Sequence, residues 1–208
     1  MLRSLVYDVL LLRLTRHWYA EVLARVPQSA AVLDVGVGTA GALLANVERV
    51  REKQLHITGI DIDAGYIARA QRRVARSPVN DRVAVRCESV YGHEGGPYDA
   101  VYFSASFMLL PEPERALRHC RALLRPGGCI LFTQTIEQRP SPAMEWLKPM
   151  LKRVTSIDFG RVTYEADFRA QIEAAGLVLE EFTTLATHGR RASCLARARP
   201  GEADEGSA

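Results

Sequence analysis

A glycine-rich segment with an aspartate before and after it is the part of the sequence best suited to chemistry. Residues 36–41 read Gly-Val-Gly-Thr-Ala-Gly and follow directly on the apolar segment 31–35. Glycines in such a turn allow positive φ angles and let a ligand approach the backbone closely. Asp61 ends the next apolar segment, and a carboxylate there can accept hydrogen bonds from both hydroxyls of a ribose. The pattern predicts a site for a nucleotide-like ligand.

Asp34 separates two kinds of ligand that the glycine spacing alone would admit. A dinucleotide places its pyrophosphate near the first glycine turn and the N-terminus of the following helix. A carboxylate two residues before Gly36 would repel that pyrophosphate, whereas it would attract a cation. A dinucleotide site stays open on spacing alone, but Asp34 favours a positively charged ligand.

Short apolar segments and amphipathic segments alternate along the chain and would position these residues. Strands are predicted at residues 31–35, 56–60, 82–87, 100–103 and 129–133. Helices are predicted at residues 42–50, 63–76 and 112–124. Strands that alternate with helices predict a mostly parallel sheet covered on both faces, so the candidate residues would meet at its carboxyl edge.

The two ends of the chain complete the predicted fold. An amphipathic pattern over residues 4–25 indicates one or two helices, which are expected to form an N-terminal cap over the candidate site. Helices are also expected at residues 143–154 and 164–175, and β-like segments at 177–185 and 191–198. Because turn residues join the last two segments, they predict an antiparallel hairpin.

The predicted fold class is therefore α/β: a Rossmann-like, doubly wound, mostly parallel seven-stranded sheet that ends in an antiparallel hairpin, with an N-terminal helical cap. Residues 1–199 are expected to form a single domain, with residues 1–28 as the cap and residues 134–168 as a lid-like insert. Residues 200–208 lack large apolar side chains and are expected to be a disordered tail.

Five ordered motifs resemble those of the class I S-adenosylmethionine-dependent methyltransferases. Residues 32–40, Val-Leu-Asp-Val-Gly-Val-Gly-Thr-Ala, are similar to the first motif of that family, V-L-D-x-G-x-G-T-G. The other four are Thr58-Gly-Ile-Asp-Ile-Asp63, Cys87-Glu-Ser89, Tyr98-Asp-Ala-Val101 and Leu124-Arg-Pro-Gly-Gly128. The likeness is greatest to the small, single-domain enzymes typified by quinone biosynthesis, which implies a small-molecule methyl acceptor.

The resemblance implies S-adenosylmethionine as cofactor, whose ammonium and sulfonium groups would suit an acidic cradle. It implies that Asp61 binds the ribose diol, that Ile62 packs on the adenine ring, and that Glu88 accepts from the adenine amino group. The full set of expected cofactor-binding residues is Asp34, Gly36, Gly38, Asp61, Ile62, Glu88, Ser89 and Ser104. Asp99 is expected to be structural instead.

Three positions depart from the family pattern. Ala40 replaces the last glycine of the first motif, and Glu88 replaces an aspartate. Met108 and Leu109 stand where the family segment Ser-x-x-Leu-His-His-Leu-Pro has its histidines, so the obvious general base is missing. The acceptor would then be nucleophilic already, or a base would come from elsewhere. Candidates for a catalytic group are Tyr7, Tyr19 and Gln134. Further candidates are His17, Glu137 and Tyr164.

The sequence therefore predicts an enzyme that transfers a methyl group by in-line displacement to a small molecule. One alternative is a protein or other macromolecule as the acceptor. Residues 103–106, Phe-Ser-Ala-Ser, lack the Asn/Asp-Pro-Pro-Tyr of amino-methylating relatives, which disfavours that subgroup. A non-catalytic methyltransferase-like partner subunit is the other alternative, and the missing histidines motivate it.

Composition and charge exclude several partners. The formal net charge of +3, from 27 basic and 24 acidic residues, is too balanced to indicate nucleic acid, and four widely spaced cysteines indicate no metal site. No apolar run approaches the roughly 20 residues of a membrane span. We expect a cytoplasmic monomer or homodimer, with the mitochondrial matrix as an alternative because the N-terminus carries arginines. His93 and the stripe Arg69, Arg72, Arg73 and Arg76 are expected at the surface.

Overall fold

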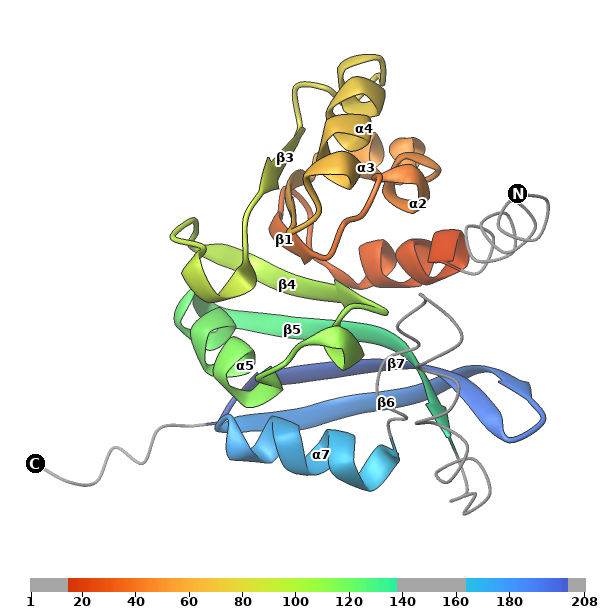
Figure 1. Ribbon diagram of the computed structural model, residues 1–208, viewed down its shortest axis with the longest axis vertical. Coiled ribbons are helices and arrows are strands. Elements are labelled where there is room, and N and C mark those ends of the chain that lie inside the picture. Colours follow the sequence, from red (N-terminus) through yellow and green to blue (C-terminus); the bar gives the residue numbers. More distant parts are fainter. Residues whose placement is uncertain (1–14, 138–163, 202–208) are drawn as a thin grey trace, which may run out of the picture.

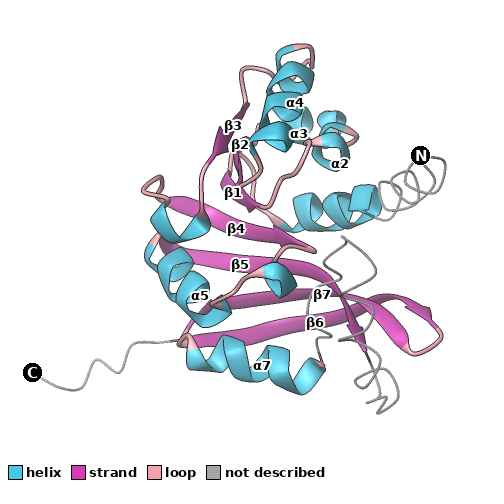
Figure 2. Ribbon diagram, viewed as in Figure 1, coloured by secondary structure: helices cyan, strands magenta, loops and turns pink. Residues whose placement is uncertain are grey.

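The computed structural model describes residues 15–137 and 164–201, which build one seven-stranded sheet with helices on both faces (Figures 1 and 2). The strand order is β3-β2-β1-β4-β5-β7-β6. The strands are β1 (Ala31–Val35), β2 (His56–Asp61), β3 (Val83–Cys87), β4 (Tyr98–Ser104), β5 (Leu124–Glu137), β6 (Leu177–His188) and β7 (Arg191–Pro200). The predicted α/β fold class is confirmed.

The pairing of the strands brings the ends of β1, β2 and β4 to one edge. β1 pairs in parallel with β2 on one side and with β4 on the other, and β2 pairs in parallel with β3. β7 runs antiparallel to both β5 and β6, which confirms the predicted hairpin. The carboxyl ends that carry Asp34, Asp61 and Ser104 therefore lie side by side.

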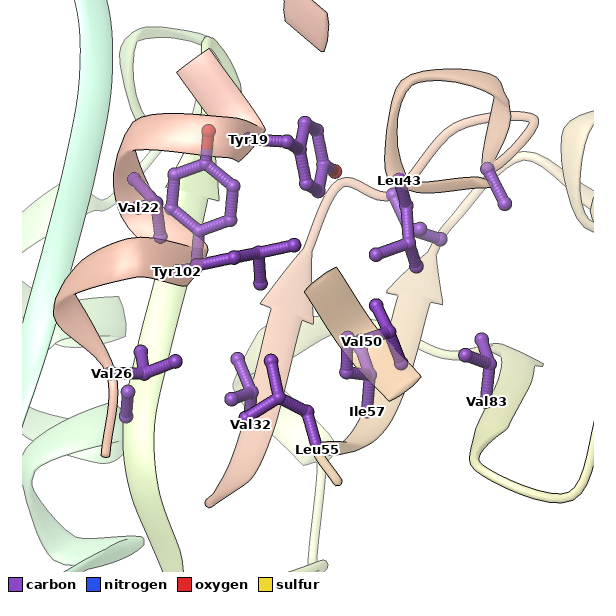
Figure 3. Packing of buried hydrophobic residues seen from close by; sticks show 14 of the residues in the cluster. Tyr19, Val22, Val26, Val32, Leu43, Val50, Leu55, Ile57, Val83 and Tyr102 are labelled. Atoms are coloured by element: carbon purple, nitrogen blue, oxygen red, sulfur yellow. The ribbon is translucent and has the colours of Figure 1, made fainter. Parts of the chain in front are cut away.

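Side chains alternate along the strands and separate the interior into two clusters, one on each face. Val32 of β1 belongs to the cluster beneath residues 15–25, α2 (Gly41–Leu44), α3 (Val47–Glu52) and α4 (Ala64–Ala75), part of which Figure 3 shows. Leu33 belongs to the cluster beneath α5 (Pro113–Ala122) and α7 (Glu165–Ala174). Two short 3-10 helices, η1 (Val90–Gly92) and η2 (Phe107–Leu109), follow β3 and β4. Both faces of the sheet are covered, as predicted.

The single helix predicted at residues 42–50 is wrong, because α2 and α3 are separate helices. Asn46 lies at the break, where its side-chain nitrogen donates to the carbonyl oxygens of Ala42, at 2.9 Å, and Arg16, at 3.1 Å. An asparagine that binds nearby backbone carbonyls competes with helix continuation. The second bond also ties this break to the helix that precedes β1.

The last strands are longer than the sequence pattern predicts. β5 continues through residues 134–137, and α7 begins at Glu165, so both ends of the predicted insert 134–168 form regular elements of the sheet layer. The prediction that the tail begins at residue 200 is wrong, because Pro200 pairs with Leu177 at the end of β7. The predicted helix at 143–154 and the rest of the tail beyond Gly201 lie outside the described residues.

The helix of residues 15–25 is anchored by its C-terminal end. The Lys53 ammonium donates to the carbonyl oxygens of Leu23, at 3.0 Å, and Ala24, at 2.8 Å, and also to that of Val26. Helix C-termini present unpaired carbonyls and partial negative charge, so a lysine there satisfies both. Arg25 also pairs with Glu181 of β6 at 3.1 Å. These bonds hold the helix, and Tyr19 on it, over the sheet (Figure 3).

In the part of the chain that the structure describes, no helix combines the length and the apolar character needed to cross a membrane. Among the same residues, no three or more histidine, cysteine, aspartate or glutamate side chains gather as a metal site would require.

Lys53→Met should lower the free energy of unfolding by about 1 kcal/mol, because the helix carbonyls lose a charged donor that an apolar side chain cannot replace. Urea unfolding followed by tryptophan fluorescence measures the change. Arg51→Met, at an exposed position of α3, is the matched control and should change stability little. Equal effects of the two substitutions would contradict the capping role of Lys53.

Candidate functional site

Asp34 is a buried carboxylate at the end of β1, with 1% of its surface exposed. Tyr19 donates its hydroxyl proton to Asp34 Oδ2 at 2.7 Å. Within the described residues, Asp34 Oδ1 is buried and accepts no hydrogen bond. Burial raises the pKa of Asp34 to about 7, with a smaller upward contribution from Asp61, although the bond from Tyr19 lowers it. The carboxylate can therefore take a cation at low cost, since a positive charge would offset its desolvation.

The glycine turn after β1 packs closely against a side chain at one position and leaves open space at another. Gly36 has a φ of +81°, and a Cβ there would collide with the side chain of Ser106. Gly38 has a φ of +57°, and nothing lies within 4 Å of where its Cβ would stand. Gly36 is required by packing, whereas Gly38 faces a space that a ligand can occupy.

Ala40 adopts the left-handed conformation that a glycine would take without strain. Its φ is +56°, it is buried, and it is the N-cap of α2. For an alanine, this conformation costs on the order of 1 kcal/mol. The family glycine at this position therefore serves the backbone, and its replacement here stores a small strain beside the turn.

Asp61 closes β2 and links the glycine turn to α4. Its Oδ2 accepts from the backbone N–H of Gly38 at 3.0 Å, and its Oδ1 accepts from that of Asp63 at 2.9 Å. Asp63 in turn caps α4 by accepting from the N–H of Tyr66 at 2.8 Å. A carboxylate offers about four acceptor positions, so Asp61 is held in place and can still accept from two hydroxyls. Ile62 follows it with 78% of its surface exposed.

Glu88 follows β3 and lies next to Asp61, because its backbone N–H donates to the carbonyl oxygen of Asp61 at 3.1 Å. Its carboxylate is partly exposed and contacts the ring of His93 at 2.6 Å. Ser89 is exposed and caps η1, accepting from the N–H of Tyr91 at 3.4 Å. The expectation that His93 is a surface residue is wrong, because the ring is 1% exposed.

A cluster of hydroxyl groups lies beneath the helix of residues 15–25. The hydroxyl oxygens of Tyr102 and Thr133 are 2.6 Å apart, and the ring of Tyr19 packs edge-on against that of Tyr102. Burial raises the pKa of both tyrosines above the usual value, although the nearby Ser104 hydroxyl lowers each pKa somewhat. Both phenols stay protonated near neutral pH, so Tyr19 is suited to donate a proton and unsuited to act as a base.

Gln134 lies on β5 opposite Cys194 of β7, just beyond the last residue pair that joins β4 to β5. It is 2% exposed, and in the described part of the chain neither its amide nitrogen nor its amide oxygen has a hydrogen-bond partner. The indole nitrogen of Trp18, next to Tyr19, is likewise buried and has no hydrogen-bond partner among the described residues. Such groups cost free energy until a ligand pairs with them.

The remaining candidates fall into three groups. Tyr7 lies outside the described residues. Glu137 is nearly buried, contacts Arg191 at 3.4 Å and forms a β-bridge with Tyr164, while His17 is exposed on its helix.

The expected cofactor-binding residues lie together at the carboxyl edge of β1 to β4, with Tyr19 above them. They are Asp34, Gly36, Gly38, Asp61, Ile62, Glu88, Ser89 and Ser104.

Two residues outside the site have structural contacts. Asp99 accepts from the N–H of Ala31 at 2.7 Å and from Arg125 at 2.8 Å, which is the structural role expected of it. Arg73, from the arginine stripe on α4, donates to the Thr39 hydroxyl at 2.6 Å and so braces the glycine turn. Neither contact was visible in the sequence pattern, because both join residues more than 25 positions apart.

Comparison with known sequences finds similarity to methyltransferases. The model of a family described as a methyltransferase domain matches residues 33–130, just under half of the chain. The ubiquinone biosynthesis O-methyltransferase of Acinetobacter baumannii (strain AYE) is 27% identical over 162 residues, covering 74% of this chain and 66% of that protein. Its counterpart in Bordetella avium (strain 197N) is 32% identical over 125 residues, covering 60% and 49%. The chain thus spans less than two thirds of these relatives.

Solved structures agree on the fold. Geranyl diphosphate C-methyltransferase from Streptomyces coelicolor A3(2), in a complex with S-adenosyl-L-homocysteine, matches with a TM-score of 0.70 at 14% identity, over 89% of this chain and 78% of that one. The cyclase SpnF matches with a TM-score of 0.73 at 18% identity, over 89% and 81%. The fold alone therefore accommodates more than one reaction. The chain is thus similar in sequence to methyltransferases, within residues 33–130 for the family model, and it shares the fold of solved methyltransferase structures.

Proposed function

We propose that this protein is an enzyme that binds S-adenosylmethionine and transfers its methyl group to a small molecule. The observation that carries the proposal is the buried Oδ1 of Asp34, which lacks a hydrogen-bond partner among the described residues and lies beside the glycine turn. When bound, this cofactor supplies an electrophilic methyl group on a sulfonium and a cationic ammonium group. The protein would offer Asp34 to the cation, in surroundings where burial strengthens their attraction.

The other carboxylates along the edge extend the proposed site. Asp61 would accept from the ribose hydroxyls while the backbone N–H groups of Gly38 and Asp63 hold it still. Glu88 would accept from the adenine amino group, and the exposed side chain of Ile62 would pack on the ring. Gly36, Ser89 and Ser104 would line the remaining surface. Acidic groups at three neighbouring strand ends suit a cation better than a pyrophosphate.

At the acceptor end, the described side chains are better suited to orient a substrate than to deprotonate it. An amide cannot act as a base near neutral pH, but Gln134 offers one donor group and one acceptor group. Tyr19 keeps its proton because burial raises its pKa. Rate acceleration would then come from the alignment of donor and acceptor, with an acceptor that is already nucleophilic. The relatives' names, O-methyltransferases of ubiquinone biosynthesis, support a small-molecule acceptor.

The partners, location and oligomeric state of the enzyme are part of the same proposal. A net charge of +3 and the use of Arg73 to brace the glycine turn argue against a nucleic-acid partner. We propose a cytoplasmic location, which the bacterial origin of the relatives supports, and a monomer or homodimer. The lid-like part of the insert and the remainder of the cap stay predictions.

Calorimetric titration with S-adenosylhomocysteine, and separately with NAD, tests the cofactor directly. We expect one molecule of S-adenosylhomocysteine to bind per chain in the micromolar range, and NAD not to bind. Binding of NAD in place of S-adenosylhomocysteine would overturn the proposal. Labelled methyl groups that enter precipitable material, and not the small-molecule pool, would overturn the choice of acceptor.

Asp61→Ala should weaken S-adenosylhomocysteine binding roughly tenfold to a hundredfold, because the ribose hydroxyls lose a charged acceptor and the Gly38 amide loses its partner. Asp81→Ala removes an exposed aspartate that pairs only with its neighbour Arg82 among the described residues, and it serves as control. Unchanged affinity in the Asp61 variant would place the ribose elsewhere.

Affinity for the cofactor should rise with pH up to about pH 7.5, because the pKa of Asp34 is raised to about 7. Below that pKa the carboxyl is neutral and attracts the ammonium weakly, so affinity falls toward tenfold per pH unit as pH drops to about 5.5. Titrations across this interval measure the slope. Asp34→Asn should bind weakly and remove the slope, and a flat wild-type profile would contradict the role of Asp34.

A further inference from the structure

Two buried side chains, those of His93 and Tyr98, form a hydrogen-bonded row with Glu88 outside the glycine turn. The Nδ1 atom of His93 is 2.6 Å from Glu88 Oε2, and its Nε2 atom is 2.8 Å from the hydroxyl oxygen of Tyr98. His93 is 1% exposed, and Tyr98 is buried as well. None of the family motifs in the sequence includes His93, although Glu88 and Tyr98 each belong to one.

The positions of the protons follow from what each group can donate. An ionised carboxylate only accepts, so His93 Nδ1 carries a proton and donates it to Glu88. In a neutral imidazole, Nε2 then accepts from the hydroxyl of Tyr98. Burial raises the pKa of Tyr98, so its hydroxyl keeps the proton that this arrangement needs. Each of the two contacts, Glu88 to His93 and His93 to Tyr98, then contains one proton.

The loop between η1 and β4 is built around the His93 ring. A Cβ at Gly95 would lie 2.5 Å from both His93 Nε2 and the Tyr98 hydroxyl, so only glycine lets the loop close over this pair. His119 of α5 contacts the backbone carbonyl oxygen of His93 at 2.8 Å. The rings of His93 and Tyr98 also stack, with centroids 5.8 Å apart. Gly95 and Tyr98 thus enclose the ring, and His119 holds the backbone that carries it.

This arrangement uses one oxygen of Glu88 and leaves the other for a ligand. Oε2 is bound by His93, while Oε1 lies 3.8 Å from Arg86, beyond hydrogen-bond distance. The Glu88 side chain is 35% exposed, and the backbone of Glu88 is bonded to that of Asp61. Oε1 is thus ion-paired with Arg86 at a distance that leaves it able to accept a hydrogen bond, and it lies beside the proposed ribose acceptor.

We propose that His93, held by Tyr98, is a positioning residue that orients Glu88 so that Oε1 accepts from the exocyclic amino group of adenine. The inference rests on the proposed function and adds to it the source of base selectivity. A site built to accept from an amino group rejects an analogue that lacks it, because the acceptor is then left unpaired. His93 would sharpen that rejection by preventing Glu88 from turning away.

The test compares two ligands, S-adenosylhomocysteine and its analogue in which purine replaces adenine, by calorimetric titration. The wild type should prefer the adenine ligand by at least about tenfold, and His93→Ala should reduce this preference severalfold with little change in affinity for the purine ligand. His93→Asn should restore part of the preference, because its amide can still donate to Glu88. His56→Ala, at an exposed histidine of β2, is the matched control.

Tyr98→Phe gives an independent reading if His93→Ala does not fold, and it should lower the preference in the same direction. An unchanged preference in the folded His93 or Tyr98 variant would overturn the inference, as would equal weakening of both ligands, which indicates a purely structural role. If the wild type binds S-adenosylhomocysteine and its purine analogue equally well, this inference is overturned and the proposed function is not. If the wild type binds neither ligand, both the proposed function and this inference are overturned.

Discussion

The burial of one carboxylate constrains the whole candidate site. Asp34 ends a central strand with one oxygen bound by Tyr19 and the other, among the described residues, without a partner. An unpaired carboxylate oxygen in the interior is tolerated only where something repays its desolvation. The helix of residues 15–25 supplies one hydrogen bond to Asp34, through Tyr19. The open space at Gly38 leaves room for a ligand that could pair with the other oxygen. The anchoring of that helix by Lys53 thus serves the site as well as the fold.

The carboxylates at the sheet edge share one design. Each is held by a donor from the chain and keeps acceptor capacity for a ligand: Asp34 by Tyr19, Asp61 by two backbone N–H groups, and Glu88 by His93. Parallel pairing brings their strand ends together, so residues far apart in sequence meet along one line. The near-neutral net charge of the chain conceals this local excess of negative charge.

Much of the fold could be predicted from the sequence, because the strands are short apolar segments that end at glycines and aspartates. The positions of Asp34, Asp61 and Glu88 at one edge follow from the parallel sheet. What could not be predicted depends on contacts between distant residues. His93 is buried because the loop through Gly95 folds over it, and Asn46 divides a helix because it reaches the carbonyl of Arg16. The left-handed backbone of Ala40 likewise has no signal in residue type.

A crystal structure with S-adenosylhomocysteine would test the central claim most directly, namely that Asp34 receives the positive end of the ligand. The account predicts the ligand's ammonium group within hydrogen-bond distance of Asp34 Oδ1, directly or through one water, with the ribose hydroxyls on Asp61. A complex in which Asp34 Oδ1 stays without a partner, or in which the ribose lies away from Asp61, would contradict it.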